Sequence, residues 1–300
     1  MEHPPFSLTR DPQFWERKWL EAKARSPINR RYRFDEKEEI EAWNRRAASY
    51  ARQTESECSR LKKIEILRQL ESAGALHSDF RVLDIGAGPG NFTLPLSARV
   101  KEVVALEPAV EMLKILESRV KRAGLTNVKT INRPWQAIDP EGEEFAGAFD
   151  LAFASMSPGI NDPDALKKMN RVSRHSCYLS GWSGPNWGRW GRAQTELWQI
   201  IFNEDPGDYP SDMLYPFGLL YSLGYRPEIR FMPVTVSLEE KKSDAAEGLI
   251  SLFEQYTEIG AAERKLIEEY VSSRCSQDLF RMESRACQGF MTWRVDSRCF

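Results

Sequence analysis

The feature that most restricts the fold is an alternation of short apolar runs with helical stretches between residues 81 and 182. Helical patterns occupy the stretches near 91–99, 109–123 and 163–173. Runs rich in Val, Leu, Ile and Phe, typical of buried strands, are RVLDIG (81–86), EVVALE (102–107), NVKTI (127–131), FDLAFASM (149–156) and CYLSGW (177–182). The alternation predicts an α/β fold with a doubly wound, mostly parallel sheet covered by helices on both faces.

Both flanks of this region predict additional elements. Residues 1–75 form a helical extension, with one helix over DPQFWERKWLEAKA and then, from Asp35 to Ala75, either two helices or one kinked helix. Helical patterns follow at 189–203 and 211–223. Two further strands, 224–238 broken at Pro233 and 285–295, complete a seven-stranded sheet within a domain of residues 76–300, with a helical insertion at about 239–278.

Composition removes several function classes. The chain has 42 Lys+Arg against 44 Asp+Glu, so it lacks the basic excess of a protein that grips a long nucleic-acid track. Residues 22–34 hold five basic residues and no acid, which fits either a solvated connector or a patch for an anionic partner. No apolar run approaches the roughly 18 residues of a membrane span, and the first residues hold no signal-peptide core, so we expect a cytoplasmic protein without a membrane partner.

The five cysteines are scattered and never form a CxxC pair. We interpret them as reduced thiols and predict no metal site.

The most informative stretch is VLDIGAGPGNFTLPL, residues 82–96. A strand ends at Asp84 and Ile85, glycines stand at 86, 88 and 90, and Glu107 ends the next strand 21 residues after Gly86. Glycines let a sharp loop bring its backbone close to a ligand, and a carboxylate at the end of the second strand can accept both hydroxyls of a ribose. Together they predict an adenosine-type ligand. NAD is disfavoured because Asn91 stands where a dinucleotide loop has its third glycine.

From Arg81 to Trp182 the chain resembles the class I S-adenosylmethionine-dependent methyltransferases, whose first motif is a strand followed by D-x-G-x-G-x-G. The resemblance implies S-adenosylmethionine as cofactor, Glu107 at its ribose, and Tyr50 folded over it. Trp135 and Gln136 would pack on and hydrogen-bond the adenine, although Trp135 is equally a candidate for core packing, and Tyr50 for packing on a helix face. The cofactor-binding residues implied are Tyr50, Asp84, Gly86, Ala87, Gly88, Gly90, Asn91, Phe92, Glu107, Pro108, Met112, Trp135, Gln136, Ala154 and Ser155.

The methyl acceptor is expected at the carboxyl ends of the fourth and fifth strands. Ser157-Pro158-Gly159-Ile160 departs from the motif of enzymes that methylate base amines, which argues against that chemistry. Aromatic walls with an arginine suit a flat or carboxylated small molecule, although the tryptophans after the fifth strand could instead pack the following helix. The predicted acceptor residues are Met156, Ser157, Trp182, Trp187, Arg189 and Trp190.

No catalytic base is assigned. His77 and His175 precede their strands and should lie at the opposite edge of the sheet. Transfer from a sulfonium mainly requires alignment of the acceptor and exclusion of water.

The sequence thus predicts a methyltransferase for a small molecule, with residues 35–75 and the insertion as a lid. The alternatives are a methyltransferase for a protein or RNA partner, and a non-catalytic cofactor-binding subunit or sensor.

Overall fold

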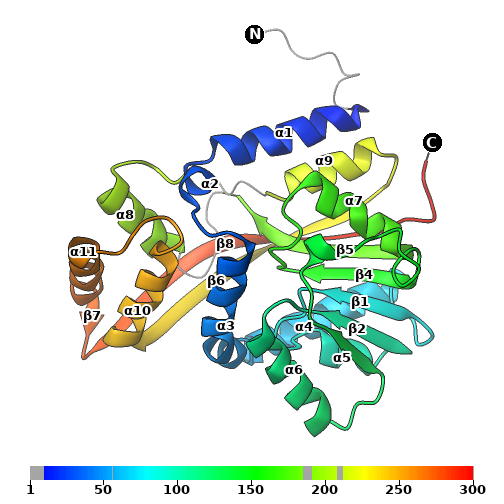
Figure 1. Cartoon of the computed structure of the whole chain (residues 1–300), viewed down its shortest axis with the longest axis horizontal. Coiled ribbons are helices and arrows are strands. Elements are labelled where there is room, and N and C mark those ends of the chain that lie inside the picture. Colours follow the sequence, from blue (N-terminus) through cyan, green and yellow to red (C-terminus); the bar gives the residue numbers. More distant parts are fainter. Residues whose placement is uncertain (1–9, 56, 185–190, 208–211, 300) are drawn as a thin grey trace.

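The computed structural model describes residues 10–55, 57–184, 191–207 and 212–299, and its centre is one twisted sheet with helices on both faces (Figure 1). The strand order is β3-β2-β1-β4-β5-β8-β6, and a two-residue strand, β7, pairs with β8 outside this order. The five strands β1 to β5 run parallel to one another, while β8 is antiparallel to β5 and β6. The strands are β1 (Arg81–Ile85), β2 (Glu102–Leu106), β3 (Val128–Ile131), β4 (Phe149–Ser155), β5 (Ser173–Ser183), β6 (Glu228–Lys241), β7 (Cys275–Ser276) and β8 (Leu279–Arg294). The expected mostly parallel sheet of seven strands is confirmed, with β7 as a small addition.

Alternate residues of the strands bury themselves against different helices, as the period of two requires. Leu83 faces the core under α1 (Pro12–Arg25), α7 (Pro163–Val172) and α9 (Leu214–Ser222). Val82 faces the other core, under α4 (Glu57–Ser72) and α5 (Thr93–Ser97), and α6 (Val110–Arg122) packs on β2 through Leu116. Within the described ranges, no helix combines the length and the apolar character needed to cross a membrane.

The stretch from Asp35 to Ala75 forms two helices, which settles the alternative that the sequence left open. α2 (Pro27–Arg31) precedes α3 (Glu36–Gln53), and α4 follows. Asp35 begins α3 with a capping box, because its Oδ1 accepts from Glu38 N at 2.8 Å and its own N–H donates to Glu38 Oε2 at 2.9 Å. α4 buries Leu67 against the sheet and therefore belongs to the central layers. α3 borders both cavities described in the next section, and α4 borders the second of them.

A second core lies beside the central sheet, at the left of Figure 1. β6 and β8 stay paired along a ribbon that runs from Glu228↔Thr292 to Lys241↔Leu279. Between them come a helix pair and its loop, α10 (Lys242–Phe253) and α11 (Ala261–Ser272), which pack with α8 (Gly191–Phe202).

The expected break at Pro233 is wrong, because β6 continues through this residue and pairs it with Cys287. β6 is the edge strand, and on its open side a residue without an N–H loses no hydrogen bond. Other boundaries also shift: the helix expected near 91–99 is only α5, and β5 extends beyond the predicted 177–182 at its start.

Candidate functional site

The loop after β1 makes its turn at the carboxyl edge of the sheet. Gly86 and Gly88 have φ values of 71° and 55°, in the left-handed region that favours glycine. The N–H groups of Gly86 and Ala87 donate to Leu106 O at 2.8 and 3.0 Å, which fastens the loop to the end of β2. A Cβ at Gly86 would clash with Ser157 Oγ. Glycine at 86 therefore allows the loop after β4 to approach the loop after β1 closely.

Glu107 follows β2 and is only 6% exposed. Its Oε2 accepts from Gly88 N at 2.7 Å and its Oε1 from Ala109 N at 2.8 Å. Burial raises the pKa of Glu107, and these two hydrogen bonds oppose the increase. Because a carboxylate oxygen has two lone pairs, each oxygen can still accept a hydrogen bond from a hydroxyl group.

Asp84 is the second buried acid, 3% exposed at the end of β1. Thr93 Oγ1 donates to its Oδ2 at 2.6 Å. Burial raises the pKa of Asp84 to about 7 against the effect of that hydrogen bond, and the nearby charge of Glu107 adds to the increase. The loop is thus flanked by one carboxylate bound by backbone N–H groups and one that titrates near neutrality.

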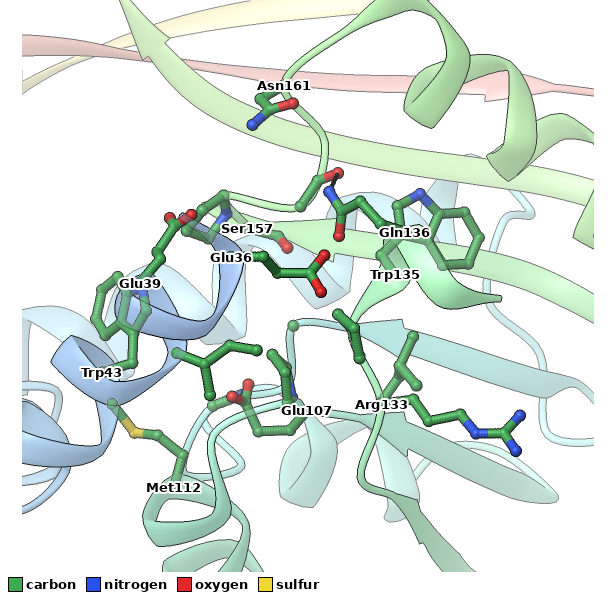
Figure 2. Close-up of a pocket in the computed structure, with 18 of the residues that line it drawn as sticks. Glu36, Glu39, Trp43, Glu107, Met112, Arg133, Trp135, Gln136, Ser157 and Asn161 are labelled. Atoms are coloured by element: carbon green, nitrogen blue, oxygen red, sulfur yellow. Dashed lines mark hydrogen bonds between the residues drawn. The ribbon is translucent and has the colours of Figure 1, made fainter. Parts of the chain in front are cut away.

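A cavity of about 350 Å³ opens beside the two loops (Figure 2). Figure 2 shows Trp43, Glu36 and Glu39 from α3 on one side and Trp135 and Gln136 on the other. The predicted residues that line this cavity are Tyr50, Gly86, Gly88, Glu107, Pro108, Met112, Trp135, Gln136, Ser155, Met156 and Ser157.

Tyr50 lies over the glycine loop. A Cβ at Gly88 would stand 4.0 Å from Tyr50 Cε1, and the Tyr50 ring meets that of Trp43 edge-on at 5.5 Å. Thr54 Oγ1 donates to Asn91 Oδ1 at 2.8 Å, which ties the end of α3 to the loop. Tyr50 therefore packs on its own helix face and also lines the cavity.

Trp135 is held mainly as a core residue. Its ring is buried and Nε1 donates to Ala165 O at 3.1 Å, while Lys168 Nζ donates to Trp135 O at 2.7 Å. Gln136 lies at the surface of the short 3-10 helix Trp135–Ala137, and its Nε2 donates to Gly159 O at 3.2 Å. Of these two neighbours, Gln136 is the one that presents a side-chain amide at the cavity rim.

The sequence interpretation missed several residues that line the first cavity, among them the following five. Glu36, Glu39 and Trp43 come from α3, Arg133 from the turn after β3, and Asn161 from the loop after β4. The α3 residues continue the helix stripe of Ile40 and Tyr50, so the period was visible in the sequence. It did not tell whether the stripe faces a core or a cavity.

A second cavity, of about 580 Å³, shares Tyr50, Gly86 and Met156 with the first. Met156, at the end of β4, has a φ of 54°, and its N–H donates to Ser180 O at 3.0 Å. A left-handed conformation at a non-glycine residue is a strain typical of functional sites. Further predicted residues that line this cavity are Asp84, Ala87, Asn91, Phe92, Ser155, Ser157 and Trp182.

Two predicted cofactor residues do not line either cavity. Ala154 is fully buried in the central core, because alternation along β4 turns it away from the surface that Ser155 reaches. Gly90 faces Leu94 and Leu116 instead, and its φ of 86° shows that it serves the turn.

The segment after β5, in which the acceptor residues were expected, is described only in part. Trp187, Arg189 and Trp190 lie outside the described residues. Arg192 is exposed and pairs through Nε with Glu196 Oε1 at 2.8 Å, and Trp198 is buried in the second core, which favours the helix-packing alternative for that tryptophan.

The two described histidines are remote from the cavities. His77 and His175 both pack around Phe80, before β1, with ring centroids 5.9 and 5.1 Å away. As expected from strand direction, they lie at the amino edge of the sheet.

Residues 82–176 match the family model for a methyltransferase domain. The fold resembles the YcgJ protein of Bacillus subtilis, with a TM-score of 0.50 and 15% identity over 77% of this chain and 97% of that one. Residues 82–176 thus carry a methyltransferase domain, and the neighbour shares its fold. The expected resemblance is confirmed for this part of the chain.

Curated relatives match shorter parts. An uncharacterised protein of Haemophilus influenzae is 26% identical over 166 residues, 55% of this chain and 58% of that protein. A 23S rRNA (uracil(1939)-C(5))-methyltransferase of Aliivibrio salmonicida is 49% identical over 53 residues, 18% of this chain and 12% of that enzyme. The chain thus spans little more than half of the first relative and a small part of the second.

The cofactor of this family is S-adenosylmethionine, and the residues present fit it. Gly86 and Gly88 present backbone without a side chain to the first cavity, and Glu107 keeps acceptor capacity for a pair of hydroxyls.

Proposed function

We propose that this methyltransferase transfers the methyl group of S-adenosylmethionine to a small molecule. The observation that carries the proposal is the second cavity, which continues from the cofactor side and is enclosed by α1, α3, α4, α8, α9 and α10 as well as by strand ends. A cavity that is lined by so many elements suits a small molecule, because the walls can surround the entire ligand.

In this proposal Glu107 accepts the ribose hydroxyls, and Asp84 with the glycine loop faces the methionine end. Pro108, Met112 and Gln136 border the adenine. Tyr50 covers the cofactor from α3, which its position over Gly88 supports.

Bound S-adenosylmethionine supplies an electrophilic methyl group on a positively charged sulfur. The protein's part is to orient the acceptor and exclude water. Met156 and Ser180 fix the floor where β4 and β5 end, and Trp43 and Trp182 are apolar walls. These residues would hold the acceptor atom in line with the methyl group that the bound cofactor would supply.

We further propose that α3 and the insertion close over bound ligands. Trp43 and Tyr50 from α3 and Leu252 from α10 line the second cavity, so movement of either region would change access to it.

A macromolecular acceptor is the second candidate, because two of the relatives are named as ribosomal RNA methyltransferases. The basic stretch that could anchor RNA is largely engaged within the protein. Lys23 Nζ donates to Asn161 O at 2.8 Å, Arg31 pairs with Glu204, and Arg33 pairs with Glu258 at 3.4 Å. These contacts favour the small-molecule acceptor.

The test is to incubate the full chain with S-adenosylmethionine that carries a labelled methyl group and with the separated metabolite, RNA and protein fractions of a cell extract. We expect label and a mass gain of one methyl group in the metabolite fraction. Label found only in RNA or protein would overturn the proposed acceptor class. Cofactor binding without transfer to any fraction would favour the non-catalytic alternative.

A further inference from the structure

The charge of the second cavity indicates what it binds, an inference that rests on the proposed function. Arg46 from α3 and Lys62 and Lys63 from α4 line it. Among its described lining residues the one carboxylic acid is Asp84, which is hydrogen-bonded to Thr93. The second cavity therefore carries an excess of positive charge. The first cavity is lined instead by four acids, Glu36, Glu39, Glu107 and Asp162, with Arg133 as the cation among its described lining residues.

Arg46 is the arginine among these three cations, and Glu39 on the same helix is the acid whose charge acts on it. Arg46 is half-buried, its Nε donates to Ala42 O at 3.0 Å, and its guanidinium lies 4.5 Å from the centre of the Trp43 ring. No carboxylate of the described residues lies within ion-pair distance of it. A half-buried guanidinium with hydrogen-bond donors to spare is a site for an anion.

Two buried N–H donors line the same cavity without a protein acceptor. They are Gln194 Nε2 on α8 and Trp19 Nε1 on α1, in side chains 5% and 1% exposed. A buried donor without a partner is costly, and such groups usually meet a ligand or another polar group. Arg46, Gln194 and Trp19 are thus three hydrogen-bond donors on three separate helices, and all three residues line the second cavity.

We propose that the acceptor carries an anionic oxygen group, a carboxylate or a phosphate ester, which Arg46 binds with Gln194 and Trp19 as neutral donors. Trp43, Met213 and Trp182 provide apolar walls for the rest of the molecule. The anionic group fixes the orientation of the acceptor in the cavity.

Arg46→Ala tests the proposal, with Arg45→Ala as the matched control, because Arg45 is the adjacent, exposed arginine of the same helix and lines neither cavity. The probes are benzoate, phenyl phosphate and the neutral benzamide. Each is titrated by calorimetry into the full chain saturated with S-adenosylhomocysteine.

We expect at least one anion to bind the natural protein and Arg45→Ala more tightly than benzamide does. Arg46→Ala should weaken that binding at least about tenfold and leave benzamide unchanged. Gln194→Leu should also weaken anion binding without lowering the unfolding temperature, because it removes a buried donor that has no partner.

Equal binding of benzamide and both anions, or equal loss in the two arginine variants, would overturn the anion site. Unchanged affinity of Arg46→Ala for S-adenosylhomocysteine shows that its cofactor site is intact. The proposed function fails by a different result, label in RNA or protein alone, so the two failures can be told apart.

Discussion

Asp84→Asn should make the protein without cofactor more stable at neutral and alkaline pH. The amide oxygen of asparagine can still accept the hydrogen bond from Thr93 Oγ1, and the side chain has nearly the same volume. What disappears is the ionisation of a carboxyl that is 3% exposed.

The magnitude follows from the pKa of Asp84, which burial raises from 3.8 to about 7. Below about pH 4 the carboxyl is protonated in the folded and unfolded states alike, and its contribution to stability is fully present. Between about pH 4 and pH 7 only the folded state keeps the proton, so stability falls as pH rises. Each pKa unit is worth about 1.4 kcal/mol, which gives an upper limit of about 4 kcal/mol above pH 7.

The assay is urea unfolding of the cofactor-free protein at several pH values from about 4 to 8. The free energy of unfolding of Asp84→Asn should match that of the natural protein near pH 4 and exceed it by about 1 to 4 kcal/mol at pH 8. Asp278→Asn is the control, since this aspartate is exposed. Parallel pH curves for the natural protein and Asp84→Asn would refute the reasoning.

Three further predictions concern the cofactor. Glu107→Ala should weaken S-adenosylmethionine binding by about 1 to 3 kcal/mol in calorimetry, because ribose hydroxyls lose charge-assisted hydrogen bonds; an unchanged affinity in the folded variant contradicts the ribose role. Gly86→Ala should weaken cofactor binding, since its Cβ would clash with Ser157 and shift this wall of the cavity, whereas Gly147→Ala, also at positive φ but with no atom near its added Cβ, should keep it. Hydrogen exchange should slow at residues 40–55 and 245–270 with saturating cofactor, and exchange that ignores the cofactor counts against the lid.

The local sequence pattern was sufficient to predict those elements that pack against their immediate neighbours in sequence. The alternation from Arg81 to Trp182 predicted β1 to β5 in order, and the spacing of Gly86 and Glu107 predicted that the loop and the acid meet. Gly88 N and Glu107 Oε2 are 2.7 Å apart. Both results depend on chain geometry over a short distance, which the residues themselves impose.

Local pattern failed where a distant element decides. We expected Pro233 to break its strand, because the sequence does not show that this strand lies at the edge of the sheet. That place is set by pairing with β8, a strand distant in the chain, in which Cys287 is the partner of Pro233. For the tryptophans after β5 the sequence left open whether they line the acceptor pocket or pack the following helix. Trp198 packs in the second core, where its ring lies 5.0 Å from that of Tyr256.

The sequence by itself determined the class of sheet, the sharp glycine turn and the acid beside it, because periodicity and backbone freedom are local properties. Only the tertiary structure decided which face of α3 borders the cavity, and that Arg46, Gln194 and Trp19 line one space. These three side chains come from helices far apart in the chain, and their meeting depends on how those helices pack over the ends of β4 and β5. Packing of that kind leaves no spacing in the sequence from which it could be predicted.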